Sequence, residues 1–110
     1  MTATARQEAT RCSRRAGVFT RRAERDARQA EEFYQEAAKQ WRHARWLTRR
    51  PSLWDAELRY TPADIEANAR CWERLGHTYL RSSFHDTWMA ESYKATAAGY
   101  RATAARLAAV

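Results

Sequence analysis

Glycine and proline are scarce in this chain of 110 residues, which holds only three Gly and two Pro. Runs of alternating Val, Ile and Thr, which are typical of β-strands, are absent, whereas Ala, Arg, Glu and Gln, which favour helix, are abundant. A chain of this length has room for one small domain. The composition therefore predicts an all-α fold in a single domain, residues 1–110.

Long apolar runs are also missing. No stretch approaches the roughly 20 residues that a membrane span needs, and residues 1–17 lack the apolar core of a signal peptide. We therefore expect a cytoplasmic protein with no membrane partner. The two cysteines, Cys12 and Cys71, have no Cys or His partner at the spacing of a metal site, which favours reduced thiols.

Motifs for catalysis and for metal or nucleotide binding are lacking as well. The three histidines stand apart, and each glycine is isolated within a helical pattern, so no glycine-rich loop is available for phosphates. The only polar cluster that suggests acid–base work, His85 and Asp86 with Tyr79, has neither a nucleophile nor a paired carboxylate. We therefore expect no catalytic residue, no metal site, no cofactor and no enzyme activity.

What the sequence does contain is a seven-residue repeat. In the first half, every seventh residue from Ala9 to Ala44 is alanine, and the positions four residues further on form a companion series. This 4–3 spacing is typical of a long helix that packs along its length against another helix. The companion series is Ser13, Thr20, Ala27, Tyr34, Trp41 and Thr48. The pattern predicts a helix over about 5–49, ended by Pro51.

The second half repeats the pattern. Thr61-Pro62-Ala63-Asp64 supplies an N-cap hydroxyl, a proline at the first helical position and an acid in the first turn, which predicts a helix over about 62–108. A break near 82–86, at Ser82-Ser83, stays open. Two series follow at steps of seven: Ile65, Trp72, Tyr79, Asp86, Tyr93, Tyr100 and Leu107, and the small residues Ala69, Gly76, Ser83, Ala90, Ala97 and Ala104.

Together the two halves predict a long antiparallel helical hairpin with a close alanine-rich seam, either open or bent into a small helical bundle. In the connection, 50–61, Ser52 and Asp55 are placed to cap a short helical turn that folds Leu53, Trp54 and Leu58 over the end of the hairpin. A ridge of hydrophobic residues beside the seam is left uncovered by two helices, so we expect it to bind another protein subunit or a second copy. The partner-binding residues of this ridge are Phe19, Phe33, Leu47, Leu75 and Met89.

The net charge of +7 belongs to the first half of the chain. Residues 1–50 hold 13 Lys and Arg against 6 Asp and Glu, whereas residues 51–110 hold 7 of each. Arginine outnumbers lysine by 18 to 2, a bias that suits bidentate phosphate contacts. One outward heptad position carries most of a basic stripe, which we define as Arg14, Arg21, Arg28, Arg42, Arg45 and Arg49.

This arginine stripe predicts contacts to the phosphate backbone of RNA or single-stranded DNA, although a merely solvated helix face is the alternative. Trp46 lies among the last arginines of the stripe. Its ring is either a stacking platform for an unpaired base or a side chain covered by Leu53 and Trp54 of the following connection.

In its arginine stripe and its helical patterning, the chain resembles the small all-helical subunits of multi-subunit CRISPR effector complexes. The resemblance implies a non-catalytic subunit of a ribonucleoprotein complex, placed beside the guide–target duplex or the displaced strand. Two alternatives stay open. One is a secreted or partner-binding helical hairpin with a Trp-x-Gly turn, for which Trp54-Asp55-Ala56 has alanine in place of glycine. The other is a small helical inhibitor or regulator that docks on another protein.

Overall fold

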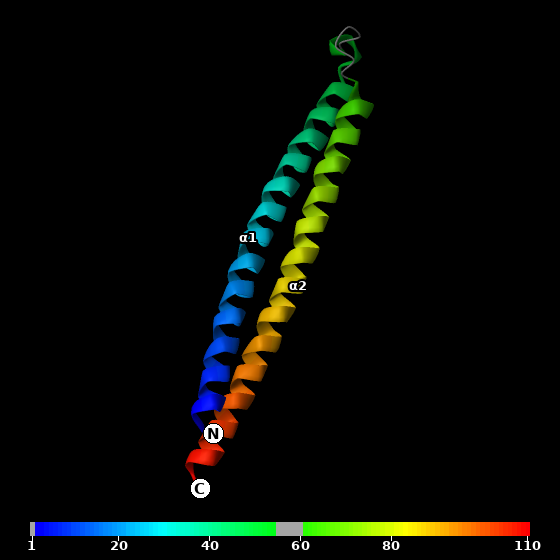
Figure 1. Ribbon diagram of the computed structural model, residues 1–110. Coiled ribbons are helices and arrows are strands. Elements are labelled where there is room, and N and C mark those ends of the chain that lie inside the picture. Colours follow the sequence, from blue (N-terminus) through cyan, green and yellow to red (C-terminus); the bar gives the residue numbers. More distant parts are fainter. Residues whose placement is uncertain (1, 55–60) are drawn as a thin grey trace. The chain divides into compact units, whose positions relative to one another are not determined.

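The computed structural model describes residues 2–54 and 61–110, and it contains two long helices (Figure 1). Helix α1 runs over Thr2–Thr48, a short 3-10 helix (η1) over Pro51–Leu53, and helix α2 over Pro62–Ala108. No strand occurs among the described residues. Helix α2 continues through Ser82-Ser83 without the break that the sequence left open.

The beginning of α2 follows from its first four residues. Thr61 is the N-cap: its backbone N–H donates to Asp64 Oδ2 at 3.0 Å, its hydroxyl donates to the same oxygen at 2.9 Å, and the Asp64 N–H points back at the Thr61 hydroxyl at 3.4 Å. This reciprocal arrangement satisfies backbone donors that the first turn leaves free. These hydrogen bonds lower the pKa of Asp64, and the one from the Thr61 backbone N–H has the largest effect.

The connection is only partly described. Pro51 begins η1, and the Trp54 indole Nε1–H donates to the backbone carbonyl of Leu47 at 2.7 Å, which ties the connection to the last turn of α1. Leu53 and Trp54 nevertheless stay exposed. The cap predicted from Asp55 and the covering role predicted for Leu58 lie outside the described residues, as does the Asp55-Ala56 part of the Trp-x-Gly comparison.

The contacts between the helices group into two compact units. The turn unit, as we call it, is Asp26–Arg81, and the terminal unit is Met1–Arg25 together with Ser82–Val110. In each unit a segment of α1 packs antiparallel against a segment of α2 (Figure 1). The predicted all-α helical hairpin is confirmed in this form.

The core of both units is the alanine seam. The α1 alanines at steps of seven are buried, and they meet the small series of α2, which is buried as well: Ala9, Ala16, Ala23, Ala30, Ala37 and Ala44 on α1, and Ala69, Gly76, Ser83, Ala90, Ala97 and Ala104 on α2. Small residues on both sides let the helix backbones approach closely. In the terminal unit, the buried Ser83 hydroxyl reaches across the seam and donates to the backbone carbonyl of Ala23 at 2.8 Å.

Gly76 shows how close the helices come in the turn unit. A Cβ atom added there would lie 2.8 Å from Cε1 of Tyr34, so the ring lies directly against the glycine backbone. Four residues of the predicted companion series, Ser13, Thr20, Tyr34 and Trp41, are half-buried, but Ala27 and Thr48 are exposed. The prediction that the whole companion series lies in the seam is therefore wrong at these two positions.

Candidate nucleic-acid interface

The arginine stripe is exposed throughout, because its positions lie away from the buried alanines of α1. Arg14 and Arg21 belong to the terminal unit, and Arg28, Arg42, Arg45 and Arg49 to the turn unit. No ion pair links any of the six guanidinium groups to a carboxylate among the described residues. The i,i+4 pairing of Glu24 with Arg28 that the sequence allows is not formed.

The positive charge is concentrated at the two ends of the stripe. Residues 1–22 hold six arginines and one acid, and residues 42–50 hold four arginines and no acid. Between them, residues 23–41 hold three basic and five acidic residues. The positive charge of residues 1–50 therefore lies mainly in two basic clusters, one in each unit, and Arg28 of the stripe lies in the acidic stretch between them in the sequence.

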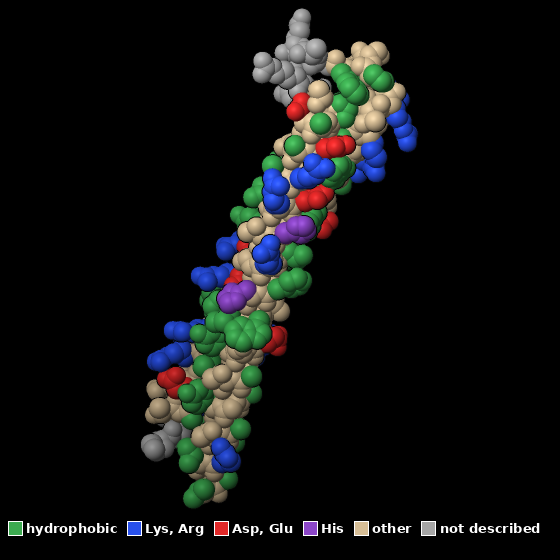
Figure 2. All heavy atoms as spheres, turned by 90° about the vertical axis from the view of Figure 1, so that its right-hand side faces the viewer, with side chains coloured by type: hydrophobic (Ala, Val, Ile, Leu, Met, Phe, Trp, Pro, Cys, Tyr) green, Lys and Arg blue, Asp and Glu red, His purple; other side chains and the backbone are tan. Residues whose placement is uncertain are grey.

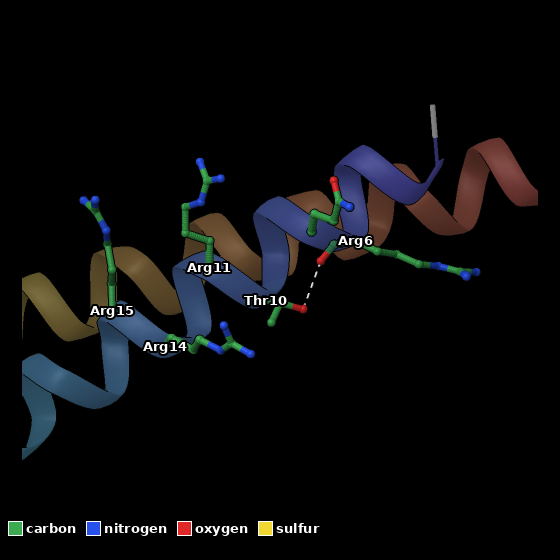
Figure 3. A pocket seen from close by; sticks show the side chains of 6 residues that line it. Arg6, Thr10, Arg11, Arg14 and Arg15 are labelled. Atoms are coloured by element: carbon green, nitrogen blue, oxygen red, sulfur yellow. Dashed lines mark hydrogen bonds between the residues drawn. The ribbon is translucent and has the colours of Figure 1, made fainter.

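The cluster of the terminal unit surrounds a shallow hollow on α1. Figure 3 shows Arg11 and Arg15 pointing the same way from the helix, while Arg6 and Arg14 leave it in other directions. The Thr10 hydroxyl donates to the Arg6 carbonyl at 3.1 Å, and Arg11 pairs with Glu8 at 3.0 Å. The hollow is lined by Arg6, Gln7, Thr10, Arg11, Arg14 and Arg15.

Two arginines of the terminal unit are engaged with aromatic rings. Arg15 Nη1 donates to the Tyr93 hydroxyl at 3.1 Å and its guanidinium lies 5.8 Å from the centre of that ring. This hydrogen bond is the main reason that the pKa of Arg15 is raised. The Tyr93 ring stacks on Phe19 with the centroids 5.7 Å apart, and the Arg22 guanidinium lies 5.5 Å from the centre of Phe19. Arg15 therefore links α1 to α2, and Arg22 lies over a ring of its own helix, in contrast to the stripe arginines.

The cluster of the turn unit contains Trp46. A second hollow there is lined by Arg42, Arg45, Trp46, Arg49 and Arg50. The Arg50 guanidinium lies 4.5 Å from the centre of the Trp46 ring, and its Nη1 donates to the Trp46 carbonyl at 3.1 Å. Trp46 is 45% exposed. Leu53 and Trp54, the residues predicted to cover it, are exposed as well. Trp46 is therefore a surface side chain that carries a cation on its ring, and not a covered one.

The structure corrects the predicted ridge of partner-binding residues. Leu47 is buried with Ala44 and Ile65. Phe33 is half-buried, with its ring centre 5.5 Å from that of Trp72 and 5.4 Å from that of Tyr79, and Phe19 packs on Tyr93. The expectation that two helices leave these three side chains uncovered is wrong for Leu47, whereas Phe19 and Phe33 are half-buried because aromatic residues of α2 pack against them. Leu75 is exposed and Met89 is half-buried, so of the five only Leu75 is fully on the surface.

Helix α2 carries an exposed hydrophobic pair, of which sequence reasoning missed Phe84. Phe84 is 66% exposed and Trp88 is 64% exposed, and the four-residue spacing places them on the same face of the helix. His85 lies beside Trp88, with the ring centres 6.4 Å apart. Figure 2 shows hydrophobic side chains at the surface over α2, with histidine side chains next to them. The available signal in the sequence was that Phe84 belongs to neither seven-residue series and therefore lies outside the seam.

Other kinds of site find no support in the described part of the chain. Residues 2–54 and 61–110 contain no group of three His, Cys, Asp or Glu side chains placed to hold a metal ion. Neither α1 nor α2, as described, has an apolar segment long enough to cross a lipid bilayer. Comparison of the chain with protein-family models, with curated proteins and with solved structures finds no match.

Proposed function

We propose that this chain is a non-catalytic, nucleic-acid-associated protein whose arginine stripe contacts the phosphate backbone. The observation that carries the proposal is the contrast among the cations of α1. Arg11, Arg15 and Arg22 are engaged with a carboxylate or an aromatic ring, whereas Arg14, Arg21, Arg28, Arg42, Arg45 and Arg49 have no carboxylate partner among the described residues. Exposed guanidinium groups that are not neutralised by the protein are available to an external polyanion.

Such binding is expected to be tight at low salt and insensitive to sequence. Phosphate contacts release condensed counterions, so affinity falls steeply as salt rises, and they carry no direct information on base identity. Trp46 adds a stacking surface for an unpaired base, because its ring is exposed beside Arg50 and His43. We propose a cytoplasmic ribonucleoprotein as the setting, with a role comparable to that of the small helical subunits of CRISPR effector complexes.

The test is charge reversal within the turn unit. Arg28→Glu with Arg42→Glu should weaken binding of a fluorescent single-stranded RNA, and the slope of log Kd against log salt should decrease by about 0.7 for each phosphate that the variant no longer neutralises. The matched control is Arg74→Glu with Arg81→Glu, because both side chains are exposed on α2 of the same unit. Arg70 is unsuitable as a control, since its guanidinium lies 5.6 Å from the centre of the Trp41 ring.

If the two double variants lose equal affinity, the stripe does not bind RNA specifically and is a solvated helix face. Absence of any RNA or DNA binding by the unmodified protein at about 0.15 M salt, close to physiological ionic strength, would rule out the proposal as a whole. Circular dichroism of each variant checks that the helices are retained.

A second candidate function is docking on another protein, and the exposed pair Phe84 and Trp88 favours it. Large exposed aromatic side chains on one helix face are typical of protein interaction sites. Phe84→Ala with Trp88→Ala should then abolish co-purification of a protein partner from host cells while leaving the affinity for RNA unchanged. Loss of RNA binding in this variant would instead assign the two rings to the nucleic acid.

A further inference from the structure

The seam has a polar side, and on this side the two units differ. In the turn unit this side is filled by Tyr34, which packs on Gly76 and lies edge-on to His77, and by Trp41, whose indole N–H donates to Glu73. In the terminal unit the corresponding positions of α1 are Ser13 and Thr20, which are too small to fill it. The terminal unit keeps a shallow groove beside the seam at these positions.

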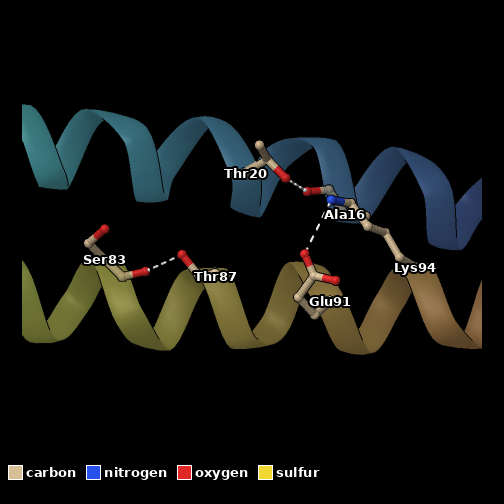
Figure 4. Close-up of polar contacts among 6 residues, drawn as sticks. All are labelled: Ala16, Thr20, Ser83, Thr87, Glu91 and Lys94. Carbon is tan, nitrogen blue, oxygen red and sulfur yellow. Dashed lines mark hydrogen bonds and ion pairs between the residues drawn. The ribbon is translucent and has the colours of Figure 1, made fainter.

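We call this the terminal groove and define it by the residues that line it. Ser13, Gly17 and Thr20 of α1 line it beside the seam. Its flanks are cationic on both helices: Arg14 and Arg21 come from α1, and Lys94 and Arg101 come from α2. Figure 4 shows Lys94 reaching from α2 toward α1 beside Ala16 and Thr20.

The polar groups of the terminal groove are placed by short contacts. Arg101 Nη2 donates to the Ser13 hydroxyl oxygen at 2.5 Å, which holds the guanidinium across the groove. Lys94 pairs with Glu91 of its own helix at 3.4 Å, and the Thr20 hydroxyl donates to the Ala16 carbonyl at 2.9 Å. Glu24 is the one acid among the lining residues, against four cations. The groove thus has an excess of positive charge from two helices.

Resting on the proposed function, we propose that the terminal groove holds the phosphates of a single nucleic-acid strand, and that Arg101 and Lys94 of α2 bind them together with Arg14 and Arg21 of α1. A linear chain of phosphates matches cations placed on both flanks of a groove. A duplex is too wide to enter the space between two helices in contact, so it would reach only the outward arginines. The net neutrality of residues 51–110 hides this contribution from sequence reasoning.

Gly17 keeps the terminal groove open. A Cβ atom added there would lie 3.4 Å from Arg21 Nη1, an ordinary contact, so a side chain is accepted without a clash against the backbone. A larger apolar side chain would occupy the groove and leave the charge of the protein unchanged. Gly99, also in the terminal unit, has no atom within 4 Å of an added Cβ and lies outside the groove, which makes it a matched control.

The experiment measures the Kd of the full chain for a fluorescein-labelled oligouridine and for a labelled DNA duplex at fixed salt. Gly17→Leu and Arg101→Glu should each weaken oligouridine binding about tenfold, the equivalent of one well-made contact, and duplex binding much less. Gly99→Leu and Arg106→Glu, changes of the same kind in the same unit, should leave both values within about twofold. Circular dichroism shows whether each variant is folded.

The possible outcomes distinguish failure of the groove proposal from failure of the proposed function. Wild-type binding of oligouridine by Gly17→Leu and Arg101→Glu, with weaker binding by Arg14→Glu and Arg21→Glu, would overturn the groove and leave the arginine stripe in place. Parallel losses of affinity for duplex and single strand would overturn the single-strand assignment. Failure of the unmodified chain to bind any of these polyanions would overturn the proposed function and the groove with it. If Gly17→Leu does not fold, Lys94→Gln replaces it, because the ion pair of Lys94 lies within its own helix.

Discussion

Replacement of each glycine by alanine tests the close helix contact at Gly76, because the three glycines have different surroundings in the same kind of helix. Alanine is favoured over glycine in a helix interior by about 1 kcal/mol. At Gly99 the added Cβ meets nothing within 4 Å, so Gly99→Ala should raise the free energy of unfolding by about this amount. At Gly17 the nearest atom is a guanidinium nitrogen at 3.4 Å, and a similar gain is expected.

Gly76→Ala should behave in the opposite way. Its Cβ would lie 2.8 Å from Cε1 and 3.0 Å from Cδ1 and Cζ of Tyr34, distances that force the ring or the helices apart. Overpacking of this kind costs about 1–3 kcal/mol, so after the helix gain the variant should be less stable than the parent by up to about 2 kcal/mol. The propensity term cancels when Gly76→Ala is compared with Gly99→Ala, which leaves an expected difference of about 1–3 kcal/mol.

Urea unfolding followed by circular dichroism at 222 nm measures the difference, with all variants in one buffer. The matched control is the double variant Gly76→Ala with Tyr34→Ala, compared with Tyr34→Ala alone. Without the ring, the added methyl group should raise the free energy of unfolding by most of the amount expected from helix propensity. If Gly76→Ala stabilises the protein as much as Gly99→Ala does, the ring does not lie against the glycine, and the close seam of the turn unit is wrong.

The remaining predictions concern the seam and the cap of α2. Ala30→Leu and Ala37→Leu should each destabilise the protein by about 1–3 kcal/mol because both alanines are buried, whereas Ala38→Leu, at an exposed position, should have little effect in the same urea assay. Because hydrogen bonds from Thr61 lower the pKa of Asp64 below its ordinary 3.8, the stabilisation by this cap should be present above that value and lost as the pH falls through the lower pKa of the folded state. Asp64→Asn should therefore show a smaller drop in unfolding midpoint than the parent between about pH 5 and pH 3, and an unchanged drop would mean that the carboxylate does not cap α2.

Much of the fold was predictable because the seven-residue repeat reports directly on burial. Ala9 to Ala44 and the small series of α2 are buried as the spacing indicates, and Thr61 and Asp64 cap α2 as their order predicts. Burial at the edge of the seam was not predictable in the same way. At the companion positions Thr20 and Trp41 are half-buried whereas Ala27 is exposed, although all three have the same place in the repeat.

The candidate site was predictable only on one helix. A stripe on α1 is visible in the heptad positions, but the partners of each arginine depend on the register between the helices. That register places Tyr93 against Arg15 and Phe19, and it brings Arg101 to Ser13 across 88 residues of sequence. No local pattern encodes such pairs, so the engaged and the free cations, and the cations that α2 adds, required the structure.

The division into two units has a consequence for the order of folding. The contact of Trp41 with Glu73 in the turn unit closes a loop of 32 residues, whereas that of Ser13 with Arg101 in the terminal unit closes one of 88. If each contact formed first in the unfolded chain, closure of the longer loop would cost about 0.9 kcal/mol more free energy than closure of the shorter one. Once the turn unit is paired, it holds both helices near each other, and the remaining contacts form by extension toward the chain ends. We therefore expect the helices to pair from the connection toward the chain ends, with the terminal groove formed last.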